Sequence, residues 1–127
     1  MTTTERSRTV MQQAYADAAV GNIDGFFAAI AADVVVTEPA FLPYGGRYVG
    51  VDAFKGLLGE IAKYLDLGSA KVDALVADGD TVVACLRANT VRDGSEVRLM
   101  ERAVVRNEKI VSLDIYVQQM GSMAARQ

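Results

Sequence analysis

Apolar side chains recur every three or four positions over two stretches of the chain, residues 7–20 and 51–64. That spacing places them on one face of a helix. Between these stretches, Asn22 or Asp24 is a suitable cap for a shorter helix, which carries two phenylalanines and Ile30 on one side. The first half of the chain therefore predicts three helices.

In the second half, the pattern changes to the alternation of strands. Asp-Gly pairs at 78–79 and 93–94 are strong hairpin signals between alternating segments. Four strands are predicted here, over 72–77, 81–91, 96–106 and 109–118. Two earlier strands are expected, one over the apolar run 34–37, which Pro39 ends, and a short one over 47–49.

Helices followed by a four-stranded antiparallel meander are typical of an α+β domain. A long, strongly curved sheet wrapped around a helix would leave a deep cavity at one end, lined mainly by apolar side chains with a few polar groups. The 127 residues suffice for one domain with its own core and are too few for two. We expect the ordered core over residues 8–118 and a loose tail after Met120.

The composition, 51% hydrophobic with a net charge of -3, is typical of a soluble globular protein. The arginines between 98 and 106 alternate with glutamates, as on a solvated strand face, and this argues against nucleic-acid binding. No apolar run approaches the roughly 20 residues that span a bilayer, and the first residues lack the apolar core of a signal peptide. We therefore expect a cytoplasmic protein that binds neither nucleic acid nor membrane. The single cysteine, Cys85, lies in an apolar run and is expected to be buried and inert.

Histidine is absent from the chain, so the usual general base at neutral pH and the commonest metal ligand are missing. Any acid–base chemistry then falls to a carboxylate. Glu38 is the best-placed candidate, because it shares strand parity with Val34 and Val36 and so points into the core or lies at its rim. An apolar setting raises a carboxylate pKa toward neutrality, where a general base works best. The alternative is an exposed, solvated carboxylate at a strand end.

Two further polar residues fall on faces that are otherwise apolar. Tyr15 lies on the apolar side of the first helix, where its hydroxyl either donates to a developing enolate oxygen or bonds to backbone in the core. Glu101 shares strand parity with the apolar Leu99 and Ala103. It is either a neutral hydrogen-bond donor or second acid in a pocket, or the partner of an arginine such as Arg87, or part of a dimer interface.

The walls of the expected pocket are assigned to apolar residues on the same faces, with ordinary core packing as the alternative. They are Phe54, Leu86, Leu99, Ala103, Leu113, Ile115 and Val117. Phe41 and Tyr44, in the loop after Glu38, either form an aromatic lid at the pocket mouth or cover the edge of the core. Asp114 lies between two of the wall residues and is therefore expected to point outward, to a salt bridge or a dimer partner.

Five local features of the sequence resemble one known family. They are Tyr15 in the first helix and the stretches 21–27, 36–39, 43–50 and 108–113. Together they are similar to the nuclear-transport-factor-2-like superfamily, in its SnoaL-like and ketosteroid-isomerase-like branch. The resemblance implies a cone-shaped fold with three N-terminal helices packed on a strongly curved antiparallel sheet. That superfamily hosts isomerases, cyclases, dehydratases, epoxide hydrolases and non-catalytic binders, so the fold does not select among them.

In ketosteroid isomerases, a carboxylate base, a tyrosine and a protonated carboxylic acid share one pocket. The resemblance puts the base on Glu38, the tyrosine on Tyr15 and the acid on Glu101, with glutamate in place of aspartate at both acidic positions. Limonene-epoxide hydrolases have an arginine–x–aspartate pair that would fall on Val82 and Ala84, which argues against that reaction.

These features predict a small enzyme with no cofactor and no metal. Its carboxylate base would transfer a proton within a small, apolar, carbonyl-bearing molecule, as an isomerase, cyclase or dehydratase does. The alternative is a non-catalytic domain of the same fold that binds a small ligand or dimerises. The exposed face of the curved sheet predicts a homodimer.

Overall fold

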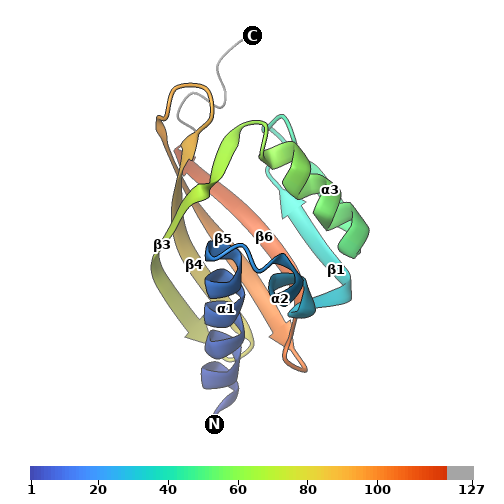
Figure 1. Ribbon diagram of the computed structural model, residues 1–127. Coiled ribbons are helices and arrows are strands. Elements are labelled where there is room, and N and C mark those ends of the chain that lie inside the picture. Colours follow the sequence, from blue (N-terminus) through green and yellow to red (C-terminus); the bar gives the residue numbers. More distant parts are fainter. Residues whose placement is uncertain (120–127) are drawn as a thin grey trace.

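The computed structural model describes residues 1–119, and the tail expected to be loose after Met120 lies outside them. Three helices and six strands make up this part of the chain (Figure 1). The helices are α1 (Thr3–Ala19), α2 (Ile23–Ala28) and α3 (Val51–Ile61), and the strands are β1 (Ile30–Glu38), β2 (Gly46–Val49), β3 (Leu65–Asp78), β4 (Thr81–Thr90), β5 (Glu96–Arg106) and β6 (Lys109–Gln119). No helix within residues 1–119 is both long and apolar enough to cross a membrane.

The six strands form one sheet in the order β2-β1-β6-β5-β4-β3. Strands β3 to β6 pair antiparallel with their neighbours in the chain, which confirms the predicted meander. Strand β1 pairs parallel with β6, so the sheet is mixed and not antiparallel throughout. The reason is the crossover through α3, which carries the chain from β2 at one edge to β3 at the other and leaves β6 to pair with β1.

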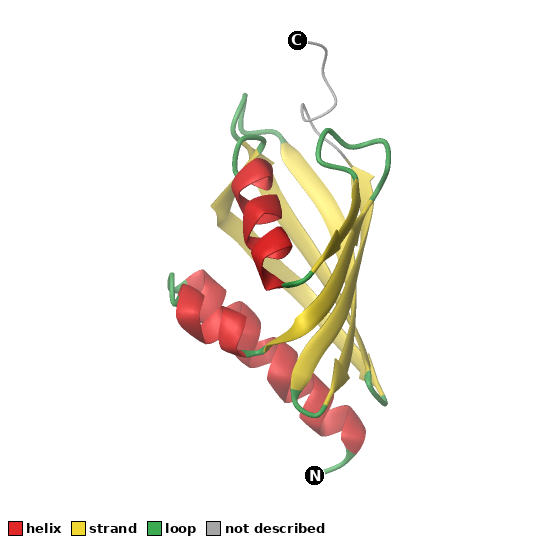
Figure 2. Cartoon of the chain, turned by 90° about the vertical axis from the view of Figure 1, so that its right-hand side faces the viewer, coloured by secondary structure: helices red, strands yellow, loops and turns green. Residues whose placement is uncertain are grey.

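All three helices cover the same face of the sheet, which bends around them (Figure 2). We call this the inner face and the opposite one the outer face. The core lies between the two layers, where Met11 of α1 and Leu57 of α3 pack with strand residues such as Val36 and Val82. The α+β class and the packing of three helices on a curved sheet are therefore confirmed.

Local hydrogen bonds explain where the first two helices begin. Helix α1 begins at Thr3, earlier than the apolar spacing predicts, because Thr2 and Glu5 form a capping box in which each side chain bonds the backbone N–H of the other. Helix α2 is capped by Asn22, whose side-chain oxygen accepts a backbone N–H. Ile30, which was expected on this helix, is instead the first residue of β1.

Strand β3 begins at Leu65, well before the predicted start at 72. Its register against β4 shifts between Asp66 and Lys71 and again between Val72 and Ala74. Most residues of its first half are exposed. The first half of this irregular edge strand is exposed and therefore does not alternate between apolar and polar residues. The sequence pattern consequently predicted only the second half of the strand.

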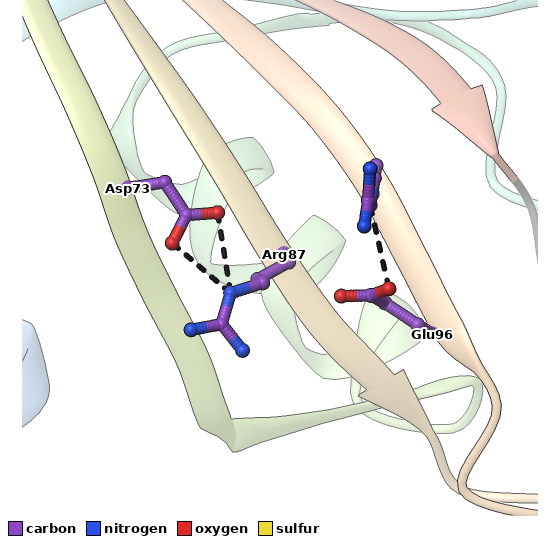
Figure 3. A network of polar contacts seen from close by, with 4 residues as sticks. Asp73, Arg87 and Glu96 are labelled. Atoms are coloured by element: carbon purple, nitrogen blue, oxygen red, sulfur yellow. Dashed lines mark hydrogen bonds and ion pairs between the residues drawn. The ribbon is translucent and has the colours of Figure 1, made fainter.

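Ion pairs cover part of the outer face. Arg87 Nε of β4 lies 3.0 Å from Asp73 Oδ1 of β3, and Arg98 Nε lies 3.3 Å from Glu96 Oε2 within β5 (Figure 3). Arg87 thus pairs with a residue of the adjacent strand and Arg98 with a residue of its own strand. The predicted solvated face holds for Arg98 and Glu96, whereas Glu101, which was predicted on the same face, lies on the inner one.

Two further side chains for which the sequence made a prediction also lie on the outer face. Asp114 Oδ2 lies 2.5 Å from Arg102 Nη2, so the predicted outward salt bridge is confirmed. Cys85 was expected to be buried, but it is half-buried and lies on the outer face between Ala74 and Met100. Both faces of this strand carry apolar residues, so the apolar run did not reveal which side chains point inward.

Candidate functional site

Glu38 is the last residue of β1, and its side chain lies on the inner face with those of Val34 and Val36. It is 6% exposed, and its Oε1 atom is buried with no hydrogen-bond partner among the residues that the structure describes. Burial, with a smaller contribution from the charge of Glu101, raises the pKa of Glu38 from 4.5 to about 8. A buried carboxyl without a partner is costly to the fold, which favours a role with a bound molecule.

Tyr15 and Glu101 are in direct contact. The Tyr15 hydroxyl donates a hydrogen bond of 2.5 Å to Glu101 Oε1, across the interface between α1 and β5. Burial raises the pKa of Glu101, and the hydrogen bond from Tyr15 partly opposes this. Burial also raises the pKa of Tyr15, with contributions from the charge of Glu101 and from the same hydrogen bond. Glu101 therefore pairs with a tyrosine and not with Arg87, which pairs with Asp73 on the outer face.

Glu38 and Glu101 lie on strands that are separated by β6 alone. Glu101 is paired with Ile115, and Thr37 is paired with Asp114, so the parallel register brings Glu38 level with Ile115. The two carboxyl groups thus belong to one row across the inner face. Two strand spacings amount to roughly 10 Å between backbones, which two glutamate side chains can span toward each other. The effect of Glu101 on the pKa of Glu38 is consistent with this arrangement.

Tyr44 lies near Glu38 and contacts two further tyrosines. Tyr44 is buried, and its ring centroid is 5.8 Å from that of Tyr64. Burial raises the pKa of Tyr44, and the charge of Glu38 contributes. The Tyr48 hydroxyl donates to the backbone oxygen of Tyr44 at 2.9 Å. Sequence analysis missed Tyr48 and Tyr64, although Tyr64 follows the buried Leu57 at helical spacing and could have been found that way.

The seven predicted wall residues fall into two groups. Phe54, Leu86, Ala103, Leu113 and Ile115 are buried. Leu99 and Val117 pack against the core but remain half-buried. Phe41, which was predicted at the pocket mouth or over the edge of the core, is 64% exposed, and its place at the mouth stays a prediction.

The inner face therefore combines two carboxyl groups of raised pKa with a tyrosine that bonds to one of them. A carboxyl with a pKa near 8 is partly ionised at neutral pH, which suits a group that takes up and returns protons. Within residues 1–119, no group of three histidine, cysteine, aspartate or glutamate residues is placed to hold a metal ion. The chemistry available from these side chains is proton transfer and hydrogen bonding.

Comparisons with known proteins address the fold. Residues 11–113 match the family model described as the SnoaL-like domain, a span that includes Tyr15, Glu38 and Glu101. No curated protein sequence matches the chain significantly.

Several solved structures share this fold. An NTF2-like protein from Burkholderia thailandensis is 25% identical, with 95% of this chain and 98% of that one aligned at a TM-score of 0.78. An NTF2-like protein from Burkholderia xenovorans is 20% identical over 97% and 95% of the two chains, with a TM-score of 0.76. A candidate ketosteroid isomerase from Kribbella flavida is 16% identical over 100% and 92%, with a TM-score of 0.73. Similarity at this level shows the nuclear-transport-factor-2-like fold and does not select a reaction.

Proposed function

The chain belongs to the SnoaL-like domain family, and on this premise we propose that it is a small enzyme that needs no cofactor and moves a proton within an apolar, carbonyl-bearing molecule. Glu38 acts as the base. The observation that carries the proposal is a carboxyl that is 6% exposed, has a pKa raised to about 8, and keeps Oε1 without a partner among the described residues.

The proposed reaction begins when ionised Glu38 removes a proton from the carbon next to the substrate carbonyl. The electron pair of the broken C–H bond moves onto the carbonyl oxygen and forms an enolate. Glu101, in the protonated form that its burial favours, donates a hydrogen bond to that oxygen, and Tyr15 holds Glu101 in place. Return of the proton to another carbon gives isomerisation, attack of the enolate carbon on a second carbonyl gives cyclisation, and loss of a β-hydroxyl as water gives dehydration.

The base can be tested before the natural substrate is known. 2-Tetralone is an apolar ketone with acidic protons beside its carbonyl, and NMR in D2O follows their exchange. We expect the wild-type protein to accelerate exchange above the buffer rate and Glu38→Gln to return it to that rate. Glu96→Gln is the matched control, because it makes the same change on the outer face (Figure 3). Exchange at the wild-type rate in Glu38→Gln would exclude Glu38 as the base.

A second candidate function is ligand binding without turnover. The observation that favours it is the Tyr15 hydroxyl, which is already bonded to Glu101 and so is not free to donate to a substrate oxygen. In this case ketones would bind to the wild-type protein and their α-protons would exchange no faster than in buffer. A cytoplasmic location and a homodimeric state remain predictions under both functions.

A further inference from the structure

The outer face carries a groove of about 510 Å³ that crosses strands β3 to β6. Cys85 and Met100, which are directly paired between β4 and β5, give the groove an apolar part. The polar side chains that line it are Asp73, Arg87, Glu96, Arg98 and Gln118. A groove of this size is within the range of sites that bind small molecules.

Three cationic residues form one row across the strands at this groove. Lys71 of β3 is the register partner of Arg87 of β4, and Arg87 is the partner of Arg98 of β5. Directly paired residues share a face of the sheet with their Cβ atoms about 5 Å apart, and like charges at such positions destabilise the sheet. An anion bound beside the row would offset this repulsion.

Two acids neutralise part of the positive charge. Figure 3 shows Arg87 between Asp73 and Glu96, and Arg98 pairs with Glu96. Three cations against two acids leave one positive charge in this group. Both arginines bond their acids through Nε, which carries one of the five N–H donors of a guanidinium group. The four donors on the Nη atoms of each arginine take no part in these two ion pairs.

We propose that this groove is a second ligand site, which binds a small aromatic carboxylate. The carboxylate lies between the Nη groups of Arg87 and Arg98, because a planar guanidinium group can bond both carboxylate oxygens. The ring lies against Met100 and Cys85, whose sulfur atoms make favourable contacts with aromatic rings. The site is on the opposite side of the sheet from Glu38, and the inference does not depend on the proposed proton transfer.

Isothermal titration at pH 7 with 2-naphthoate and 2-naphthol tests the site, because the two probes share a ring system and differ in charge. We expect naphthoate to bind at least about tenfold more tightly than naphthol, and added salt to weaken naphthoate binding. Equal affinities would overturn the proposal. So would the absence of naphthoate binding at millimolar concentration, which together with a dimeric mass in light scattering would assign the groove to a second copy of the chain.

Variants of the two arginines locate the bound probe. Arg87→Gln and Arg98→Gln should each weaken naphthoate binding by about tenfold, as expected for the loss of a charged hydrogen bond. The two side chains are 48% and 56% exposed, so the fold should tolerate both changes. Arg98→Lys keeps the charge without the planar group and should cost about threefold.

Arg106→Gln is the matched control, because Arg106 is another arginine of β5 that pairs with an acid and does not line the groove. It should bind naphthoate as tightly as wild type does. Naphthoate affinity within twofold of wild type in both Arg87→Gln and Arg98→Gln would place the probe elsewhere and overturn the proposal. The exchange of 2-tetralone reports on Glu38 alone, so either proposal can fail while the other stands.

Discussion

The Tyr15 hydroxyl lies 2.5 Å from Glu101 Oε1, and this hydrogen bond joins two residues that are 86 positions apart in the chain. It joins the first helix to the middle of strand β5, on the same inner face that holds Glu38. The contact gives the half-buried Glu101 a hydrogen-bond donor, and it fixes the position of Glu101 relative to Glu38.

Replacing Tyr15 by Phe should destabilise the fold by about 1–3 kcal/mol, since the half-buried Glu101 loses its donor while the ring still packs. Urea unfolding at neutral pH measures this change. Tyr116→Phe is the matched control, because Tyr116 is 50% exposed on the outer face and its loss of a hydroxyl should cost little. Equal stability of the two variants would mean that the Tyr15–Glu101 bond contributes nothing to folding.

The stability of the protein should fall as the pH rises from about 5 to 8. The pKa of Glu38 is about 8 in the folded protein against an ordinary 4.5, so the folded state holds this proton more tightly and gains stability at low pH. That gain is complete below pH 4.5 and lost as the pH passes 8; at about 1.36 kcal/mol per pKa unit it amounts to at most about 5 kcal/mol. Urea unfolding between pH 5 and 8.5 should show a clearly flatter profile for Glu38→Gln than for wild type or Glu96→Gln. Identical slopes in all three proteins would contradict the raised pKa.

The same pKa sets the pH dependence of the proposed proton transfer. Because the base must be ionised, kcat/KM should rise with pH and level off above about 8. Glu101→Gln should move the midpoint to lower pH, since it removes the neighbouring charge that helps to raise the pKa of Glu38. A midpoint that stays near 8 in this variant would leave burial alone as the cause.

Much of the fold could be predicted from local patterns. The turns at Gly79 and Gly94 were found because Asp-Gly suits the positive φ that both glycines adopt, 60° and 73°. The parallel pairing of β1 with β6 could not be found in this way, because its partners, such as Val36 and Leu113, are far apart in sequence and leave no local signal. Strand parity predicts which face a residue occupies, but not which strand lies beside it.

The candidate site, like the fold, could be predicted only where it depends on a local pattern. The inward direction of Glu38 follows from its parity with Val36, which a single strand determines. The partner of Glu101 depends on how α1 crosses the sheet, so the sequence suggested an arginine such as Arg87 as one alternative and did not identify Tyr15 as the partner. The value of the Glu38 pKa likewise depends on three-dimensional burial, which the sequence does not state.

Phe54 anchors α3 against α2 through two edge-to-face contacts. Its ring centroid lies 6.0 Å from that of Phe26 and 5.6 Å from that of Phe27, and its side chain is 5% exposed. Phe54→Ala should therefore cost about 3–5 kcal/mol of unfolding free energy, as expected for a large cavity in a packed core. Phe41→Ala, at a 64% exposed position, should cost under about 0.5 kcal/mol in the same urea titration. A small loss of unfolding free energy in Phe54→Ala would mean that the helices move together and fill the cavity.

The predicted homodimer has a candidate surface on the outer face. Ala74, Cys85, Met100 and Tyr116 are successive partners across four strands, and Met100 and Tyr116 are 44% and 50% exposed. The Arg102–Asp114 pair lies beside this apolar row, so a second copy turned by a two-fold rotation would meet apolar side chains at its centre and both signs of charge at its rim.

Wild-type protein at micromolar concentration should then have twice the chain mass in light scattering. Met100→Lys should weaken this dimer at least about tenfold by burying a charge, whereas Val20→Lys, at an 80% exposed position at the end of α1, should leave it unchanged. A monomeric wild-type protein, or a dimer insensitive to Met100→Lys, would remove the outer face as the interface.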